Sequence, residues 1–534
     1  MKSKFSLWLP ALILATYTVN GQDHPSNNFK PSHEIIYHVV QRSFYDSNGD
    51  LNGDLNGLRE KLGYLQELGA TSILLLPLYQ SPYYHNYFAD NFEKIDSTFG
   101  TMQDYLNLVR EVHRRGMKIY MDMETQYVTE DHEWYKDSYG NLSSPYSDFI
   151  AYDDSAHTKP SSIVYDLHEF TGYNGITKKL TTVNMNSKKV LDYNISLFSH
   201  WVDPNGDGNF NDGVDGFRLD HMMDNLDNKN RWSHLFQNFW SPLIQKVRSV
   251  NPKIIFIAEQ ANWSSFGIDY LKEAGVDRVF AFRIAFEIRN LNKKKLETVC
   301  DSTFRFTPTG KNQIVFIENH DMPRFASVVN HNPGKLRVGA VLNLLLGGIP
   351  SIYYGQELGM YGGGKSMEWG MTDGNEIPER EAFEWYKSDT GKGMAFWYRD
   401  TGPWWTNSND KPNDGISLQE EKADPNSLWR FYRNLILFRE SRETLRSGTY
   451  YGIKNNNDSV FTFLRILNDK ADLIAVNFSS KSAKAELDMQ SVSYQKKIKK
   501  LFGNGNVSSA RKNTGVQLPP YGFVVYELKN FKHN

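Results

Sequence analysis

The chain alternates short, continuously apolar segments with longer segments whose apolar residues recur every three or four positions. A strand buried on both faces of a parallel sheet reads as a continuous apolar run, and an amphipathic helix shows the longer period. The pattern therefore predicts alternating strands and helices. The eight expected strands are residues 35–40, 72–78, 118–122, 214–220, 253–259, 278–282, 313–319 and 349–354.

Two of the expected helices end at glycines, as helices commonly do. The pattern over residues 58–68 stops at Gly69, and the pattern over 102–115 stops at Gly116. Eight strands alternating with helices are typical of an α/β fold in which a parallel sheet closes into a (β/α)₈ barrel, the TIM barrel.

Two parts of the chain interrupt or follow this alternation. After the third strand, residues 124–182 are polar, tyrosine-rich and weakly periodic, which predicts an inserted subdomain B because ordinary connections are much shorter. Residues 34–123 and 183–446 then form the barrel. Residues 447–534 contain short alternating segments, which predict a C-terminal antiparallel β domain of the β-sandwich type.

The N-terminus has the pattern of a secretory signal. Lys2 and Lys4 precede an apolar run over residues 5–15, and polar residues return around Gly21. The run is too short for a membrane span, so residues 1–21 are expected to be a signal peptide and the protein to be exported, periplasmic or extracellular. No other stretch predicts a membrane span once the signal is removed. The single cysteine, Cys300, excludes an internal disulfide.

Composition narrows the partners. The formal net charge of −2 gives no basic excess, so binding to nucleic acid is not expected. The 30 tyrosines and 12 tryptophans could offer flat faces to sugar rings. The sequence does not give an oligomeric state.

Carboxylates follow several expected strands, at the end where barrel enzymes carry their active sites. Asp122, Asp220, Glu259 and Asp321 all take such positions. Arg218 and Asp220 are two residues apart on one strand and face the same side, so the guanidinium would keep that carboxylate ionised. A surface ion pair is the alternative interpretation. Three converging carboxylates favour glycoside hydrolysis.

The ordered motifs at these strand ends resemble the alpha-amylase family, glycoside hydrolase family 13. They are Gly-Phe-Arg-Leu-Asp at 216–220, Glu259 after an apolar strand, Asn-His-Asp at 319–321, the region from Pro77 through His-Asn-Tyr at 85–87 to Asp122, and residues 347–357. The resemblance covers residues 35–530 and implies the fold already expected.

The resemblance implies a catalytic trio. Asp220 would be the nucleophile that forms a covalent glycosyl intermediate, Glu259 the general acid and base, and Asp321 a carboxylate that grips sugar hydroxyls. Such chemistry requires a raised pKa for Glu259 and an ionised Asp220 beside Arg218. The residues that would contact or orient the substrate are Tyr87, Tyr127, Arg218, His320 and Arg324.

The chain departs from the family's pattern in two motifs. The usual Asn-His pair after Asp122 is replaced by Gln126 and Tyr127, which puts the usual calcium site in doubt. The usual Lys-His pair after the nucleophile is replaced by Met223 and Asp224. These positions help to form the leaving-group side of the site in the family. Because they are replaced here, the preferred linkage (α-1,4, α-1,6 or another) does not follow from them.

A separate segment matches the start of a calcium-binding loop. Asp203, Asn205 and Asp207 supply oxygens at its first, third and fifth positions, but no glutamate stands at the twelfth. The segment is therefore compatible with two interpretations, a structural Ca²⁺ site and an Asx-rich turn. The chemistry itself requires no cofactor.

The sequence thus favours a retaining hydrolase of α-glucosidic bonds, with α-1,4 the expected linkage, acting on starch-derived glucans or maltooligosaccharides. An α-glucosyl transferase on the same scaffold and a catalytically inactive glucan-binding protein are the alternatives. The sequence does not distinguish endo from exo action.

Overall fold

The structure is a computed structural model that describes residues 33–161, 166–364, 367–388, 390–495, 498–509 and 514–533. The expected signal peptide lies outside these residues. Across the described ranges, none of the helices has the length and apolar character needed to cross a membrane.

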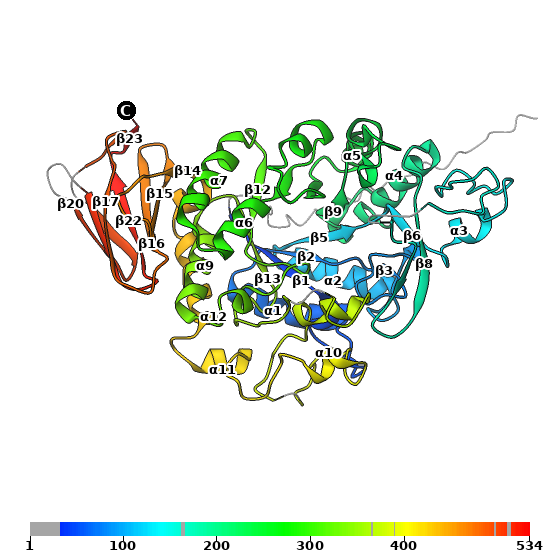
Figure 1. Ribbon diagram of the computed structural model, residues 1–534, viewed down its shortest axis with the longest axis horizontal. Coiled ribbons are helices and arrows are strands. Elements are labelled where there is room, and N and C mark those ends of the chain that lie inside the picture. The colour runs from blue at the N-terminus through cyan, green and yellow to red at the C-terminus, as the bar shows by residue number, and fades with distance from the viewer. Residues whose placement is uncertain are drawn as a thin grey trace, which may run out of the picture.

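Eight parallel strands close into a barrel at the centre of the molecule (Figure 1). Neighbours follow chain order around the barrel, and the last strand pairs with the first. Each strand lies at an expected segment, so the (β/α)₈ prediction is confirmed. The strands are β1 (Ile36–Val39), β2 (Ser72–Leu75), β5 (Lys118–Met123), β9 (Gly216–Met222), β10 (Ile255–Gln260), β11 (Arg278–Phe280), β12 (Asn312–Val315) and β13 (Ile349–Tyr353).

Helices cover the outside of the barrel, and their ends follow the sequence signals. The side chain of Asp54 accepts a hydrogen bond from the Gly57 amide at the start of the first helix, and Gly69 ends it with a φ of 108°. The helices are α1 (Leu55–Leu68), α2 (Met102–Arg114), α4 (Lys188–Val202), α5 (Ser241–Val250), α6 (Phe282–Arg289), α7 (Lys293–Phe306), α8 (Phe325–Val328), α9 (Pro333–Leu345) and α12 (Leu428–Glu440). Two π-helical turns are Phe236–Trp240 and Tyr270–Ala274.

Alternation along the strands gives the barrel an inner and an outer core. Ile36 belongs to the inner cluster with Leu74 and Tyr120, whereas its neighbour Tyr37 packs in the outer cluster. The inside of the barrel is therefore filled by side chains and is not a pore.

The insert after β5 extends from the barrel at the opposite end of the molecule from the C-terminal sheets (Figure 1). It contains β6 (Tyr127–Thr129), α3 (Glu133–Ser138), β7 (Glu169–Thr171) and β8 (Thr177–Thr182), and its three strands are antiparallel. The strands β3 (Tyr79–Gln80) and β4 (Asn91–Ile95) form a small sheet after β2. Thr171 of the insert bridges to Thr372, in the long segment that follows β13.

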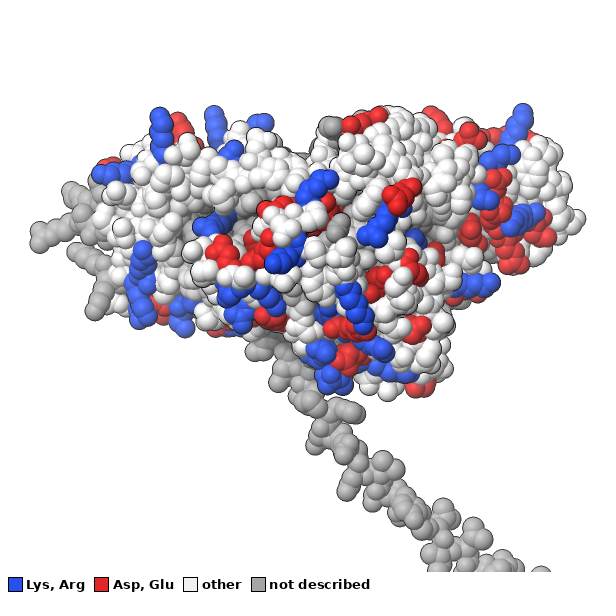
Figure 2. All heavy atoms as spheres, turned by 90° about the horizontal axis from the view of Figure 1, so that it is seen from below, with Lys and Arg blue, Asp and Glu red and all other residues white. Residues whose placement is uncertain are grey.

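That long segment carries a 3₁₀ helix (Asp373–Glu379), α10 (Pro403–Thr406) and α11 (Leu418–Ala423) before α12 begins. The amide of Tyr173 in the insert donates to the carboxylate of Asp373. The insert and the post-β13 segment thus contact each other although these residues are 200 positions apart in the chain. Lys and Arg side chains are interspersed with Asp and Glu over the face shown in Figure 2.

The C-terminal domain is antiparallel, as expected, and follows α13 (Glu443–Ser447). Its five-stranded sheet runs β14-β15-β16-β22-β19, beside the three-stranded sheet β17-β21-β20 and the pair β18-β23. Arg442 joins it to the barrel by ion pairs with Asp472 at 2.5 Å and Glu527 at 3.0 Å. The strands are β14 (Thr449–Gly452), β15 (Val460–Leu467), β16 (Lys470–Asn477), β17 (Ala483–Leu487), β18 (Val492–Ser493), β19 (Lys499–Gly503), β20 (Asn506–Ser509), β21 (Thr514–Leu518), β22 (Phe523–Lys529) and β23 (Lys532–His533).

Candidate active site

Arg218 on β9 joins three carboxylates at the mouth of the barrel. Its Nη1 donates to Asp122 Oδ2 at 2.6 Å and also to Asp220 Oδ1, and its Nη2 lies 2.9 Å from Glu259 Oε2. The Arg218 side chain is 1% exposed and that of Asp220 is 16% exposed. The alternative interpretation of Arg218 and Asp220 as a surface ion pair is therefore wrong, because this arginine is buried within a cluster of carboxylates.

Glu259, at the end of β10, is fixed at both oxygens. Its Oε2 accepts from the His221 amide at 3.0 Å, and its Oε1 accepts from Trp263 Nε1 at 3.1 Å. His221 has a φ of 41°, in the left-handed region that non-glycine residues rarely adopt. That conformation accompanies an amide aimed at Glu259, so the residue after Asp220 orients the second carboxylate. Trp263 also stacks on Phe282, with ring centroids 4.6 Å apart.

Tyr87 and His320 form the opposite wall. The Tyr87 hydroxyl donates to Asp122 Oδ2 at 2.8 Å and lies 2.7 Å from His320 Nε2, and the two rings stack with an interplanar angle of 13°. His320 Nε2 is also 3.0 Å from Asp321 Oδ2. The structure therefore brings the three expected catalytic carboxylates together with Arg218, Tyr87 and His320.

Arg380 belongs to this site, although the sequence analysis did not single it out. Its Nη2 lies 3.2 Å from Asp321 Oδ1, and its Nε donates to the His320 carbonyl at 2.9 Å. It directly follows the 3₁₀ helix of the post-β13 segment and also pairs with Glu376 at 2.8 Å. An arginine beside acidic residues in a loop-rich segment gives no distinctive signal, so only the tertiary structure identifies it.

The electrostatics of the cluster differ from what the chemistry was expected to require. Burial raises the pKa of Asp220 to about 6 and that of Asp122 to about 7, although Arg218 opposes both shifts. Burial alone would also raise the pKa of Glu259. The Arg218 guanidinium, His221 and the bonds from the His221 amide and the Trp263 indole outweigh it, so the pKa of Glu259 is lowered. The expectation of a raised Glu259 pKa is therefore wrong for the substrate-free site.

Comparison with known proteins decides the family. The family profile described as the catalytic domain of alpha amylase matches residues 38–448, and the profile of the maltogenic amylase C-terminal domain matches residues 452–525. The chain belongs to the alpha-amylase family.

Relatives and solved structures extend this match over most of the chain. Alpha-amylase 3 of Dictyoglomus thermophilum is 29% identical over 456 residues, which are 83% of this chain and 84% of the relative. Oligo-1,6-glucosidase of Parageobacillus thermoglucosidasius is 26% identical over 93% of this chain and 98% of the relative. The crystal structure of an alpha-amylase from H. orenii has a TM-score of 0.77 at 24% identity, covering 94% of this chain and 100% of that one.

Membership in the alpha-amylase family makes the chain an enzyme that acts on glycosidic bonds, with α-glucosidic bonds as its supported target. Members of this family typically need no cofactor for the chemistry. The groups that surround Arg218 are carboxylates, a histidine and a tyrosine, which together can supply a nucleophile, a proton and hydrogen-bonding partners.

Two of the expected substrate contacts lie elsewhere. Arg324 is 0% exposed and packs beneath the site, where its Nη1 pairs with Glu318 at 3.3 Å and its guanidinium lies over the rings of Tyr353 and Tyr354. Its expected role at the substrate is therefore wrong, and Arg380 takes the place near Asp321. Tyr127 is 4% exposed and packs with Tyr83 and Leu180 in the insert.

The substituted family positions have structural partners. Gln126 Nε2 donates to the carbonyls of Asp220 and His221, each at 3.2 Å, so it fixes the end of β9. Asp224 Oδ1 accepts from the Phe236 amide at 2.8 Å, and Met223 is buried. These contacts support the main chain around the nucleophile.

The segment expected as a calcium loop or an Asx-rich turn has the hydrogen bonds of a turn. The two carboxylate oxygens of Asp203 accept from the amides of Asp207 and Gly208 at 3.2 and 2.9 Å, and Asn205 Oδ1 accepts from the Asp207 amide at 2.9 Å. The ligands proposed for Ca²⁺ thus point at their own main chain and fit the turn better than the ion. Within the described ranges, no group of three or more His, Cys, Asp or Glu side chains is arranged to hold a metal.

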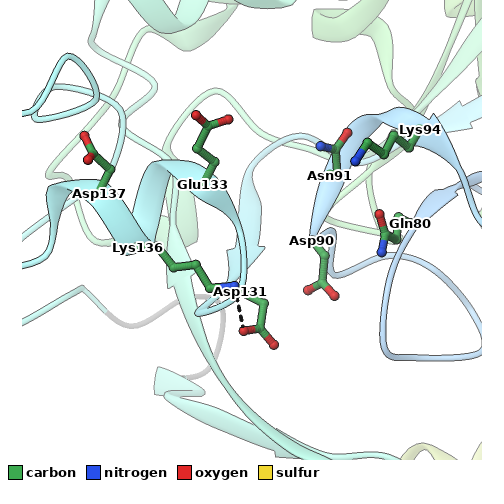
Figure 3. A pocket seen from close by; sticks show the side chains of 8 residues that line it. All are labelled: Gln80, Asp90, Asn91, Lys94, Asp131, Glu133, Lys136 and Asp137. Carbon is green, nitrogen blue, oxygen red and sulfur yellow. Dashed lines mark ion pairs between the residues drawn. The ribbon is translucent and has the colours of Figure 1, made fainter.

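A cavity of about 620 Å³ lies away from the catalytic carboxylates, between the β3–β4 sheet and the insert (Figure 3). Charged side chains of both signs line it, and Asp131 pairs there with Lys136 at 3.1 Å. Its lining residues are Gln80, Asp90, Asn91, Lys94, Asp131, Glu133, Lys136 and Asp137. The assignment of the active site therefore rests on the carboxylate cluster and not on cavity size.

Proposed function

We propose that the chain is a retaining hydrolase that cleaves α-1,4 bonds in starch-derived glucans or maltooligosaccharides. The observation that carries the proposal is the single guanidinium of Arg218 in contact with both Asp220 and Glu259. One guanidinium holds the two carboxyl groups close together, which is compatible with the spacing of about 5 Å used by retaining enzymes.

In the first step, a carboxylate oxygen of Asp220 bonds to the anomeric carbon while the glycosidic C–O bond breaks. Glu259 gives its proton to the departing oxygen. In the second step, Glu259 takes a proton from water, the water oxygen bonds to the anomeric carbon, and the bond to Asp220 breaks. The electron pair of that bond returns to the Asp220 carboxylate, so the enzyme ends each turnover unchanged.

Glu259 must acquire its proton as substrate binds, because its pKa is lowered in the empty site. A sugar over Glu259 excludes water, and the loss of solvation raises the pKa of a carboxyl group. Formation of the ester at Asp220 also removes a negative charge near Glu259. That loss returns Glu259 to the ionised form needed to activate water, so the two steps alternate its protonation.

The other residues suit the two sugars at the bond. Asp321, held by Arg380 and His320, would accept hydrogen bonds from hydroxyls of the sugar under attack, and the Tyr87 ring would stack on it. Trp263 is partly exposed, bonds to Glu259 and stacks on Phe282. We assign it to the leaving-group sugar, because Glu259 protonates the oxygen on that side.

Product analysis on a substrate panel tests this function. Wild-type protein should release reducing sugar from maltoheptaose and soluble starch faster than from isomaltotriose, and the Asp220→Asn and Glu259→Gln variants should be inactive while melting as wild type does. Faster cleavage of isomaltotriose would overturn the α-1,4 assignment. If the main products at high acceptor concentration are longer oligosaccharides, the enzyme is a glucosyl transferase and not a hydrolase.

We also propose that the chain is exported and that residues 1–21 are removed. The support is the basic start and the apolar run described above. N-terminal sequencing of protein from a secreting host should begin after about residue 21. An intact N-terminus on protein retained in the cytoplasm would contradict export.

A further inference from the structure

Glu124 is a fifth carboxyl group in the catalytic cluster, and the mechanism above does not use it. It follows β5 and is 1% exposed. The Tyr79 hydroxyl donates to its carbonyl at 2.7 Å, and its amide donates to the same hydroxyl at 3.1 Å. Its main chain is therefore held in place at the level of the nucleophile.

Gln126 fixes the Glu124 side chain. The Gln126 amide donates to Glu124 Oε1, and Gln126 Nε2 donates to Oε2 at 3.0 Å. Gln126 Nε2 also reaches the carbonyls of Asp220 and His221. The residue that replaces the family's usual asparagine therefore links Glu124 to the strand end that carries Asp220.

The carboxyl groups of Glu124 and Asp220 lie within hydrogen-bonding reach of each other. Two carboxylates have no hydrogen to share, so one of the pair must carry a proton. Arg218 pairs with Asp122, Asp220 and Glu259, and no ion pair found among the described residues includes Glu124. The proton therefore belongs on Glu124, and Asp220 stays ionised beside the guanidinium.

The surroundings agree with this assignment. Burial first, and then the charge of Asp220, raise the pKa of Glu124 well above its usual value. The charged and titratable groups around the pair include Tyr79 of β3, Tyr87, Asp122 of β5, Arg218 of β9 and Glu259 of β10. Two guanidinium groups, those of Arg218 and Arg380, face the five carboxyl groups of the cluster, so at least one carboxyl group is expected to be neutral.

We propose that Glu124 is a positioning residue that remains protonated and donates its O–H to the Asp220 carboxylate. This inference rests on the proposed function of Asp220 as nucleophile. In the first step the bond orients Asp220 toward the anomeric carbon. In the second step the bond between Asp220 and the anomeric carbon breaks, and the electron pair returns to Asp220, where the O–H of Glu124 stabilises the charge. Glu124 itself keeps its proton throughout.

Kinetics on two variants test the positioning role. Glu124→Leu removes the donor, and its kcat should fall about 10²-fold with KM nearly unchanged, as for loss of one preorganised donor. Glu124→Gln keeps an N–H donor and should retain kcat to within about tenfold. With α-glucosyl fluoride, whose first step is fast, Glu124→Leu should show a burst because the glycosyl-enzyme now breaks down slowly.

A matched control is Glu357→Gln. Glu357 is another fully buried carboxyl group with a pKa raised to about 7, and it accepts from Tyr37 and Tyr64 at 2.7 and 2.5 Å, away from the carboxylate cluster. Its variant should keep the wild-type kcat. Infrared difference spectra at neutral pH should show that Glu124→Gln removes one carbonyl band of a protonated carboxyl group.

The outcomes separate this inference from the function beneath it. If Glu124→Leu keeps the wild-type kcat while Asp220→Asn is inactive, the inference is wrong and the function stands. If the wild-type protein hydrolyses none of the glucans, the function is wrong, and the infrared band still shows whether Glu124 is protonated. If Glu124→Leu does not fold, the infrared spectrum of Glu124→Gln decides. If that variant keeps every carbonyl band of the wild type, Glu124 is not protonated and the proposal is wrong.

Discussion

Replacing Arg218 by methionine should move the acidic limb of the pH–rate profile. Arg218 contacts Asp122, Asp220 and Glu259 through its two terminal nitrogens, and methionine fills similar space without the charge. Bonds to a charged partner contribute about 1.5–3 kcal/mol, which is about one to two pKa units. The pKa of Asp220, about 6 in the native site, should rise by that amount.

The loss of activity should therefore depend on pH. At pH 6 about half of the native Asp220 is ionised, and a rise of one to two pKa units leaves roughly 1–10% ionised, a loss of about 5–50-fold from protonation alone. Near pH 8, where most of Asp220 is ionised again, most of the activity lost through protonation should be recovered. The assay is kcat/KM for an aryl α-glucoside from pH 5 to 9, with the ratio of variant to wild type plotted against pH.

Arg278→Met is the matched control for this experiment. Arg278 is buried in the same barrel and pairs with Glu34 at 2.6 Å near the amino ends of the strands. Breaking either buried pair should cost about 3–5 kcal/mol of stability. Only Arg218→Met should shift the pH profile. A ratio of variant to wild type that is constant across pH would refute the assigned role of Arg218.

Three further outcomes follow from the structure. Burial raises the pKa of Glu381 to about 8. The stability that its protonated form provides is therefore complete below the pKa of the unfolded state and is lost as pH rises through about 8. Calorimetry should show the Tm of Glu381→Gln rising relative to the Tm of the wild type between pH 5 and 9. Arg324→Met should lower stability by about 3–5 kcal/mol in urea melts yet leave the KM of the refolded enzyme unchanged, and a raised KM would restore its substrate role. Trp263→Ala should raise the KM for maltoheptaose about tenfold while its effect on α-glucosyl fluoride stays small, and equal effects on both substrates would contradict its place beside the leaving group.

The strands of the barrel could be predicted because each one is a local pattern. A continuous apolar run such as residues 73–76 has few other structures open to it, and Gly69 and Gly116 end their helices because glycine readily adopts a positive φ. Asp220 and Glu259 could be placed at the mouth because the carboxyl ends of parallel strands meet at one edge. These inferences need only neighbours in the sequence and one topological rule.

Arg380 and Glu124 could not be predicted in this way. Arg380 reaches Asp321 from the end of a short 3₁₀ helix in the long segment after β13, so its position depends on packing between distant parts of the chain. Glu124 stands two residues after Asp122 and looks like an ordinary surface residue until its burial is known. The error about Arg324 has the same origin, because sequence proximity to Asp321 does not reveal that its side chain turns under the site.

The pKa order in the cluster also depends on geometry that no pattern encodes. The sequence supplies Arg218 beside Asp220, and this suggested that the guanidinium serves the nucleophile alone. The structure divides it among three carboxylates, and the amide of His221 and the indole of Trp263 add to its effect on Glu259. Which carboxylate binds a proton first follows from that distribution.

Trapping the covalent intermediate tests the central claim most directly. A 5-fluoro α-glucosyl fluoride should inactivate the enzyme with burst release of fluoride, and mass spectrometry of the digested protein should place one fluoroglucosyl group on Asp220. Glu259→Gln should still accept the label from this reagent, because fluoride leaves without a proton. A label on another residue, or complete turnover through an inverted product with no labelled intermediate, would contradict the account.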